Sequence, residues 1–222
     1  MKIAAIIPAY NEEKNIGQVL RGVKKYADSI IVIDDGSGDK TAEKAMENGA
    51  KVYSHIINRG LGGALSTGIK AALLENSDII VTLDADGQHD PDDIPKLIKP
   101  IISGDADFVV GSRFLEKQSM PLFRKLGNYF YNLVTWILFG IRSSDTQSGM
   151  RAFNKKAAEG LEIITRGMEV SSEIIKEIKI RRLRLKEVPI KAIYTPYSLS
   201  KGQGFMVGLK TLIKLLILKL TD

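Results

Sequence analysis

The fold is decided by the stretch Ile79-Ile80-Val81-Thr82-Leu83-Asp84-Ala85-Asp86-Gly87-Gln88, which joins an apolar run to two closely spaced carboxylates. The β-branched apolar residues predict a buried strand, and the acids follow at its carboxyl end. Such acids repel each other and cost desolvation energy, which a hard divalent cation bound through oxygen commonly offsets, usually beside substrate phosphates. The alternative is a loop acid that caps the following helix.

Short apolar runs alternate with helical patterns through the first half of the chain. The strands that this pattern predicts are Ile3–Ile7, Ile30–Ile33, Lys51–His55, Ile79–Leu83 and Phe108–Val110. Helical spacing of apolar residues covers roughly Glu13–Tyr26, Lys40–Asn48, Gly62–Leu74 and Pro91–Ile102. Strands that alternate with helices in this way indicate an α/β fold, with a mostly parallel sheet covered by helices on both faces.

Polar residues follow each predicted strand. These segments are Pro8-Ala9-Tyr10-Asn11-Glu12, Asp34-Asp35-Gly36-Ser37, Asn58-Arg59-Gly60, Asp84-Ala85-Asp86 and Gly111-Ser112-Arg113. Ligands of parallel sheets bind outside the carboxyl ends of the strands, which meet at one edge. We therefore expect the five segments to converge on one cleft.

Composition and charge limit the class of protein. The 222 residues suffice for one domain with a substantial core, and the absence of cysteine excludes disulfides and thiolate metal sites. The net charge of +6 is uneven: residues 174–222 hold 11 Lys and Arg and 3 acids, giving +8, so residues 1–173 carry −2. A basic tail favours an anionic partner surface. Because aromatics are sparse there and no nucleic-acid motif occurs, we expect a membrane and no nucleic acid.

Two segments are unusually apolar for surface helices. The helix expected at Leu122–Phe139 is apolar nearly all round in its second half, which is typical of deep burial or of contact with lipid. The helix expected at Gly204–Leu220 mixes three lysines with Leu and Ile. We expect both to contact a membrane surface, and the alternative is packing in the core or in a homo-oligomer. No apolar run reaches the roughly 18 residues that span a bilayer, and no signal-peptide pattern is expected at the start.

Two further segments carry groups that suit a nucleotide. A carboxylate in Asp34-Asp35-Gly36-Ser37 can accept hydrogen bonds from a nucleobase or ribose, although Ser37 or Asp39 would also serve as a helix N-cap. The segment Asn58-Arg59-Gly60-Leu61-Gly62-Gly63-Ala64 offers backbone N–H groups at a helix start, which suits phosphate. It is not a dinucleotide fingerprint, because Leu65 replaces the third glycine, and no P-loop occurs. These absences count against a dehydrogenase and a Walker-type NTPase.

Six segments in this order resemble the family 2 glycosyltransferases, which have a GT-A fold. They are Pro8-Ala9-Tyr10-Asn11-Glu12-Glu13, Asp34-Asp35-Gly36-Ser37, Asn58-x-Gly60-x-Gly62-x-Ala64, Asp84-Ala85-Asp86-Gly87-Gln88, Gly111-Ser112-Arg113, and Asp145-Thr146-Gln147-Ser148-Gly149 with Arg151-Ala152-Phe153. The last two are similar to the dolichol-phosphate mannose synthase branch, which transfers a sugar to a polyprenyl phosphate. Each motif alone is weakly specific, but the ordered set covers the chain to about Lys201.

The resemblance implies roles on the donor side. The residues that would line the nucleoside pocket are Pro8, Tyr10, Glu12 and Asp35. Asp84, Asp86 and Gln88 would hold Mg²⁺ or Mn²⁺ against the diphosphate of a nucleotide sugar, through oxygen ligands that suit a hard ion. That cation would neutralise charge on the departing nucleoside diphosphate. In relatives a Ser-Lys segment closes over the donor phosphates, and Lys201 matches it.

The resemblance also implies roles on the acceptor side. The basic residues expected near the acceptor phosphate are Arg113, Arg124 and Arg151. A polyprenyl phosphate is ionised near neutral pH, so the site needs cations to hold it in line and no strong base. For Arg124 the alternative is a solvated residue in the first turn of a helix. Asp145 falls where relatives with hydroxyl acceptors keep a base. It would act as a base, orient the acceptor or pair with Arg151. Asp86, Arg113 and Asp145 are the expected catalytic residues.

Three other titratable residues lie near the motifs. Glu169 resembles the acid of a Phe-Glu pair in the relatives, although Met168 replaces the Phe and a helix-start carboxylate is an equal explanation. His55 ends a predicted strand and is expected to be structural. His89 follows the metal motif and would support the metal ligands.

The sequence is interpreted as an inverting, metal-dependent glycosyltransferase. It would move a hexosyl group from GDP-mannose or a UDP-sugar to a polyprenyl (dolichyl) phosphate. Residues 1–203 would form the GT-A domain and residues 204–222 a helix at the membrane surface, so we expect a peripheral protein on the cytoplasmic face. One alternative is an enzyme of the same fold with a glycan hydroxyl acceptor and Asp145 as its base. Another is a catalytically silent protein that binds nucleotide sugars.

Overall fold

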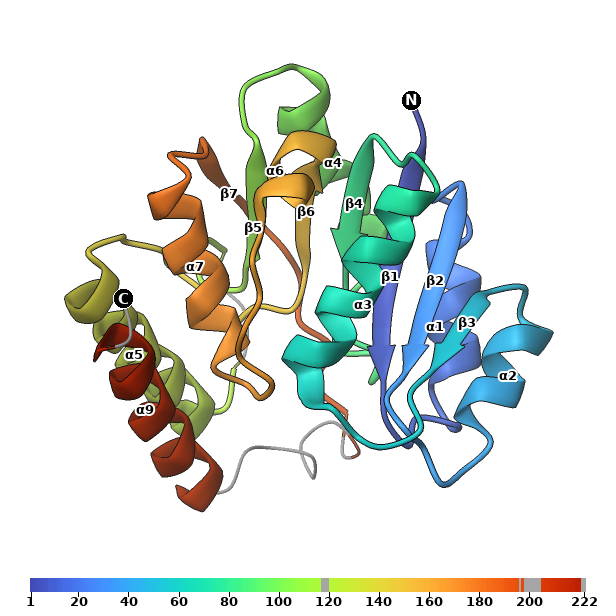
Figure 1. Ribbon diagram of the computed structural model, residues 1–222, viewed down its shortest axis with the longest axis horizontal. Helices are drawn as coiled ribbons and strands as arrows, with labels where there is room; N and C mark the ends of the chain where they lie inside the picture. The colour runs from blue at the N-terminus through green and yellow to red at the C-terminus, as the bar shows by residue number, and fades with distance from the viewer. Residues whose placement is uncertain (117–119, 196, 198–204, 221–222) are drawn as a thin grey trace.

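The residues that the structure describes form a seven-stranded sheet at the centre of the protein (Figure 1). The structure is a computed structural model that describes residues 1–116, 120–195, 197 and 205–220. The sheet has the order β3-β2-β1-β4-β6-β5-β7. Its strands are β1 (Ile3–Ala9), β2 (Ser29–Asp34), β3 (Lys51–Ser54), β4 (Ile79–Thr82), β5 (Phe108–Ser112), β6 (Arg151–Asn154) and β7 (Leu185–Pro189).

One strand reverses the direction of an otherwise parallel sheet. β6 is antiparallel to both of its neighbours, β4 and β5, whereas the other neighbouring pairs are parallel. Arg151, the first residue of β6, pairs with Thr82, the last residue of β4. The chain therefore enters β6 at the edge where β4 ends, and the residues before β6 reach the edge where ligands of such sheets bind.

Helices cover both faces of the sheet. They are α1 (Ile16–Val23), α2 (Thr41–Glu47), α3 (Gly60–Leu74), α4 (Ile94–Ile102, after a 3₁₀ turn at Pro91–Asp93), α5 (Leu122–Phe139), α6 (Lys155–Gly160), α7 (Val170–Ile180) and α9 (Phe205–Leu220). Figure 1 shows α3, α6 and α7 on the near face, with α1 and α4 behind the sheet.

Alternate side chains of each central strand enter two separate cores, which explains why the strands are continuous apolar runs. On β1, Ile7 packs in the core beneath α1 and α4, whereas Ile6 packs in the core beneath α3 and α7. A Cβ atom on Gly68 of α3 would lie 2.3 Å from Ile6 Cγ2. The glycine therefore lets α3 lie close against the sheet.

The predicted α/β fold with a mostly parallel sheet is confirmed. All five predicted strands are present, and the helix predicted at Leu122–Phe139 has those bounds. Two strands, β6 and β7, and two helices, α6 and α7, were not predicted from the sequence.

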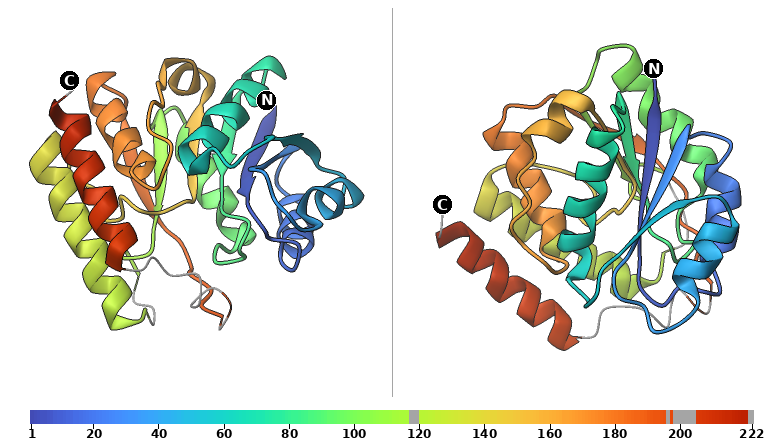
Figure 2. Two further views of the ribbon diagram at one scale, coloured as in Figure 1. Left: turned by 60° about the horizontal axis from the view of Figure 1, so that its bottom comes forward. Right: turned by 45° about the vertical axis from the view of Figure 1, so that its right-hand side comes forward.

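Helices α5 and α9 lie side by side beyond one end of the sheet (Figures 1 and 2). They pack through Phe139, Leu215 and Leu218. Lys214 of α9 also donates a hydrogen bond to the buried Glu169 carboxylate at 3.0 Å. Large apolar side chains on the rest of the pair are exposed, namely Leu122, Phe123, Leu126, Tyr129, Phe130, Leu133, Trp136, Ile137, Ile213, Leu216 and Ile217. Within the described ranges, neither these nor the other helices have the length and apolarity needed to cross a bilayer.

Candidate active site

A cavity of about 520 Å³ opens where β1 and β4 end. The residues that line it are Pro8, Tyr10, Asn11, Glu12, Asp84, Ala85 and Asp86. Because β1 and β4 are parallel neighbours, their carboxyl ends bring the Pro8–Glu12 segment against the acid pair. Two of the segments expected to converge therefore share one cavity.

The loop after β1 is fixed by the loop after β2. Asn11 has a left-handed backbone with φ of 53°, its N–H donates to Ser37 Oγ at 2.9 Å, and its Oδ1 accepts from Gly38 N–H at 2.9 Å. Glu12 is buried, and its Oε2 accepts from Asn15 Nδ2 and from the Tyr197 hydroxyl. These contacts fix the positions of Asn11 and Glu12, which line the cavity.

Asp35 organises the loop beside the cavity and is not among the residues that line it. Its carboxylate accepts hydrogen bonds from the backbone N–H groups of Arg59 and Gly60, both at 2.8 Å, and contacts His55 Nδ1 at 2.7 Å. The structural role expected for His55 agrees with this contact. The predicted place of Asp35 in the nucleoside pocket stays a prediction.

The glycine-rich segment at the start of α3 makes contacts within the protein. Gly62 N–H donates to Arg166 O at 2.9 Å, and a Cβ atom on Gly62 would lie 2.0 Å from Thr165 O. With Arg59 and Gly60 bonded to Asp35, three N–H groups of this helix start already have acceptors. The interpretation of this segment as a phosphate site is therefore wrong for these three donors, and Gly60 and Gly62 serve close packing against residues 165–166.

The acid pair after β4 has two different electrostatic environments. Burial opposes ionisation of Asp84, but His89 Nε2, 3.1 Å from Asp84 Oδ2, and the charges of His89, Arg151 and Arg113 outweigh it and lower its pKa. Burial and then the charge of Asp84 raise the pKa of Asp86. Two close carboxylates that cannot both ionise freely are suited to receive a cation.

A glycine makes room for the Asp84 carboxylate. A Cβ atom on Gly149 would lie 2.3 Å from Asp84 Oδ2, and the Gly149 carbonyl accepts a hydrogen bond from Thr82 Oγ1 at 2.9 Å. The loop before β6 therefore packs directly on the acid pair. The glycine that ends Asp145-Thr146-Gln147-Ser148-Gly149 is required by this contact.

Arg113 and Asp145 form a bidentate ion pair next to the acid pair. Arg113 Nε and Nη2 each donate to the Asp145 carboxylate at 2.7 Å, and Arg113 N–H donates to it at 3.0 Å. Burial opposes the charge of Arg113, but Asp145 outweighs it and raises the pKa of the guanidinium. Of the three roles predicted for Asp145, pairing with an arginine is observed, but the partner is Arg113 and not the predicted Arg151.

The other two predicted arginines lie at the same edge. Arg124, in the first turn of α5, donates to Gln88 Oε1 at 2.9 Å, and the Gln88 amide group contacts Asp86. Arg151 is 2% exposed, and its Nε and Nη2 have no hydrogen-bond partner among the described residues. Burial lowers the pKa of Arg151 to about 10, against the opposing charges of Asp84 and Asp145.

The donor set fits a hard divalent cation that is shared with a substrate. Within the described ranges no group of three or more His, Asp or Glu residues gathers to hold a metal alone. Asp84 and Asp86 supply carboxylate oxygens at the cavity, whereas Gln88 Oε1 already accepts from Arg124. Mg²⁺ is usually bound through one or two carboxylates together with substrate phosphates, and this pair matches that pattern.

Four residues remain: Lys201 and Glu169, which the sequence indicated, and Tyr194 and Tyr197, which it did not. Lys201 lies outside the described residues. Glu169 bonds Lys214 of α9 and Gly167 N–H, as a carboxylate at the start of α7. The sequence did not indicate Tyr194 or Tyr197, although both belong to the segment after β7 that returns to the site. The only signal was their position just before the basic Ser198–Gly204 segment.

The sequence of the chain is similar to that of known proteins. The profile described as "Glycosyl transferase family 2" matches residues 4–161. The UDP-N-acetylglucosamine–dolichyl-phosphate N-acetylglucosaminyltransferase of Methanococcus voltae is 42% identical over 98% of this chain and 96% of its own length. The dolichol-phosphate mannosyltransferase of Pyrococcus furiosus is 36% identical over 85% of this chain and 56% of its own length.

A solved structure shares the fold. The glucosyl-3-phosphoglycerate synthase of Mycobacterium tuberculosis, in complex with Mn²⁺, UDP and phosphoglyceric acid, superposes with a TM-score of 0.75. It is 20% identical, and the match covers 98% of this chain and 78% of that chain. At this identity the likeness concerns the fold alone.

Proposed function

The chain belongs to glycosyl transferase family 2 and has the GT-A fold, and we propose that it transfers a hexosyl group from a nucleotide sugar to a polyprenyl phosphate. The Methanococcus voltae relative, which matches over nearly its whole length, is named for UDP-N-acetylglucosamine and dolichyl phosphate. UDP-N-acetylglucosamine is therefore the first donor to test, and GDP-mannose, suggested by the Pyrococcus furiosus relative, is the second.

One observation carries the choice of a lipid phosphate acceptor. Arg124, in the first turn of α5, donates to Gln88 of the acid motif at 2.9 Å, and the helix then continues with a largely exposed apolar surface. A helix that begins with a cation at the site and continues as an apolar face matches an acceptor with a charged head and a prenyl tail. A soluble glycan would gain nothing from that face.

The donor would bind in the cavity at the ends of β1 and β4. Pro8, Tyr10 and Glu12 line it and would contact the nucleoside, with Asp35 beside them. Asp84 and Asp86 would hold Mg²⁺ or Mn²⁺, and Gln88 would join them by exchanging its contact with Arg124. When bound, the cation would stabilise the negative charge on the departing diphosphate.

The reaction would be a displacement at C1 of the sugar with inversion. An oxygen of the acceptor phosphate forms the new bond to C1 while the bond from C1 to the donor diphosphate breaks, and the diphosphate leaves with the electron pair. The phosphate is already ionised, so no proton has to be removed. Arg113 would hold it in line, and Asp145, bonded to Arg113 through both carboxylate oxygens, would fix the direction of that guanidinium.

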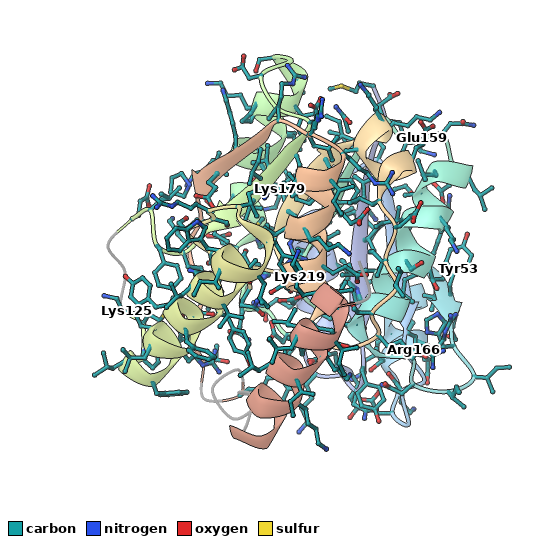
Figure 3. The ribbon with its side chains drawn as sticks, turned by 60° about the vertical axis from the view of Figure 1, so that its left-hand side comes forward. Tyr53, Lys125, Glu159, Arg166, Lys179 and Lys219 are labelled. Atoms are coloured by element: carbon teal, nitrogen blue, oxygen red, sulfur yellow. The ribbon has the colours of Figure 1, made fainter. Side chains whose placement is uncertain are left out.

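The apolar surface of α5 and α9 would bind the membrane that holds the acceptor, on its cytoplasmic face, where nucleotide sugars are expected. Burying a few of these side chains contributes roughly 1.5–3 kcal/mol each, enough for reversible attachment. Figure 3 shows Lys125 near the start of α5 and Lys219 near the end of α9, and such basic groups on the helix pair would add attraction to anionic lipid.

The test is a transfer assay with a choice of donors and acceptors. UDP-N-acetylglucosamine, UDP-glucose and GDP-mannose are each supplied with Mn²⁺ and either dolichyl phosphate or a soluble oligosaccharide. We expect sugar to appear on dolichyl phosphate, and Arg124→Ala to raise the KM for that lipid. Arg21→Ala, which changes an exposed arginine on α1, serves as the control. Transfer to the oligosaccharide alone would overturn the proposal, and no transfer with donor binding retained would favour a silent protein.

A further inference from the structure

The hydroxyl of Tyr194 is a buried donor without an acceptor. The Tyr194 Oη atom has no hydrogen-bond partner among the described residues, although almost none of its surface reaches solvent. An unsatisfied buried polar group typically costs about 1–3 kcal/mol, so a partner is expected when the site is in use. The ring itself is held, because the Arg124 guanidinium lies 5.6 Å from its centroid.

The segment that carries Tyr194 is tied to the acid motif. Ile190 N–H donates to Ser112 O at 3.1 Å, Lys191 N–H donates to Asp93 Oδ2 at 2.7 Å, and Ile193 N–H donates to Gln88 O at 2.9 Å. These bonds place Tyr194 directly after a residue that is bonded to the metal motif. Its position is therefore fixed by the backbone.

The charged groups around the Tyr194 phenol are Arg113 and Arg124, which are expected to bind the acceptor phosphate, and Asp145. Burial raises the pKa of Tyr194, against the opposing charges of Arg113 and Arg124, so the hydroxyl keeps its proton at neutral pH. The charge of Asp145 acts on both Tyr194 and Arg151. Arg151 is also fully buried with unpartnered N–H groups. Two orphaned donors thus lie near the same Arg113–Asp145 ion pair.

We infer that the Tyr194 hydroxyl donates a hydrogen bond to the acceptor phosphate, beside the Arg124 guanidinium that lies against its ring. This assignment rests on the proposed function, since it names a further residue that touches the acceptor. A phosphate monoester has the acceptor oxygens that both Tyr194 and Arg151 lack. Tyr194 would thereby help to select a phosphate acceptor over a sugar hydroxyl, because an acceptor without that charge would leave the buried donors unsatisfied.

The test separates phosphate binding from turnover. Tyr194→Phe removes the hydroxyl and keeps the ring against Arg124, and Tyr53→Phe, on the exposed edge strand β3, is the matched control. Binding of farnesyl phosphate is measured by calorimetry, with inorganic phosphate and farnesol as separate ligands. We expect Tyr194→Phe to weaken farnesyl phosphate binding about tenfold, with UDP binding and farnesol binding unchanged. The melting temperature of the ligand-free variant should rise, because the unsatisfied buried hydroxyl is gone. Weaker binding of inorganic phosphate in the same variant would place the contact on the phosphate itself.

Farnesyl phosphate that binds the wild type and Tyr194→Phe equally, or that binds neither, would overturn the assignment. A loss of UDP binding of the same size would also overturn it, because the residue would then act on the whole site. The transfer assay is read separately. If binding depends on Tyr194 but the wild type transfers no sugar to a polyprenyl phosphate, the proposed reaction fails while the phosphate contact stands.

Discussion

The Asp84 carboxylate packs against Gly149, where an added Cβ atom would lie 2.3 Å from Asp84 Oδ2. We predict that Gly149→Ala pushes this carboxylate out of its place beside His89. Binding of UDP in the presence of Mn²⁺ should fall at least tenfold, as measured by calorimetry, while circular dichroism stays unchanged. Gly127→Ala is the control, because nothing lies within 4 Å of a Cβ atom built there. Normal binding by Gly149→Ala would mean that Asp84 does not need its present position.

Asp86→Asn should abolish turnover and stabilise the metal-free protein. Burial and then Asp84 raise the pKa of Asp86, so the folded protein holds this proton more tightly than the unfolded chain does. Stability without metal should therefore fall as the pH rises from the ordinary carboxyl range through the raised pKa. The asparagine variant should not show this loss of stability, and it should be more stable than the wild type at neutral pH. Thermal unfolding in EDTA at several pH values measures this, and a destabilised variant would contradict it.

Arg113→Ala should weaken use of the acceptor more than binding of the donor. Because the substitution also strands the buried Asp145 charge, it should cost about 3–5 kcal/mol of stability. The double variant Arg113→Gln with Asp145→Asn should recover much of that stability and still show a raised KM for the polyprenyl phosphate. Chemical denaturation and initial-rate kinetics test the two parts. A defect confined to the donor KM would refute the assignment.

Charges on the exposed face of α5 should release the protein from lipid. We predict that Phe130→Glu combined with Ile137→Glu abolishes flotation with anionic liposomes and leaves UDP binding intact, because both side chains point to solvent. Leu74→Glu is the control, since Leu74 is more exposed than Phe130 and Ile137 but lies at the end of α3. Equal flotation of all three proteins would exclude α5 from the membrane contact.

Stability in acid should depend on Glu75. Burial opposes its ionisation, but hydrogen bonds from Lys51 and Lys2 outweigh this and lower the pKa of Glu75 to about 2. Its contribution is therefore complete above about pH 4.5 and is lost as the pH falls toward 2. Glu75→Gln should cost roughly 1 kcal/mol at pH 7, since both lysines are well exposed, and very little at pH 2. Urea denaturation at the two pH values measures the difference, with Glu47→Gln as the exposed control.

The part of the fold that could be predicted is the part built from apolar runs. β1, β2, β4 and β5 are buried on both faces, so their sequences are continuous and apolar. β6 begins with Arg151 and has only four residues, and β7 is an edge strand that contains two adjacent charged residues, Lys186 and Glu187. Helix α7 could not be predicted from its apolar pattern for a related reason. It buries Glu173, Lys176 and Glu177, which a helical pattern would assign to the solvent side.

The part of the site that could be predicted consists of residues at strand ends. Asp84 and Asp86 directly follow β4, and the parallel pairing of β1 with β4 brings Pro8 to them. The contact between Gly149 and Asp84 could not be foreseen, because it depends on the reversed direction of β6. The position of Tyr194 could not be predicted for a similar reason. It depends on the hydrogen bond from Ile193 N–H to Gln88 O, which brings the chain after β7 back to the acid motif.

The reversal of β6 also bears on how such proteins diversify. The chain leaves the sheet at Ser112 and returns at Arg151 along the same margin, so β5 and β6 form a hairpin whose connection is unusually long. That connection, α5 included, can lengthen, shorten or be exchanged without disturbing the strand register on either side. An ancestor could therefore acquire a new acceptor by exchanging the α5 part of this connection, as long as Gly149 at its end keeps its contact with Asp84.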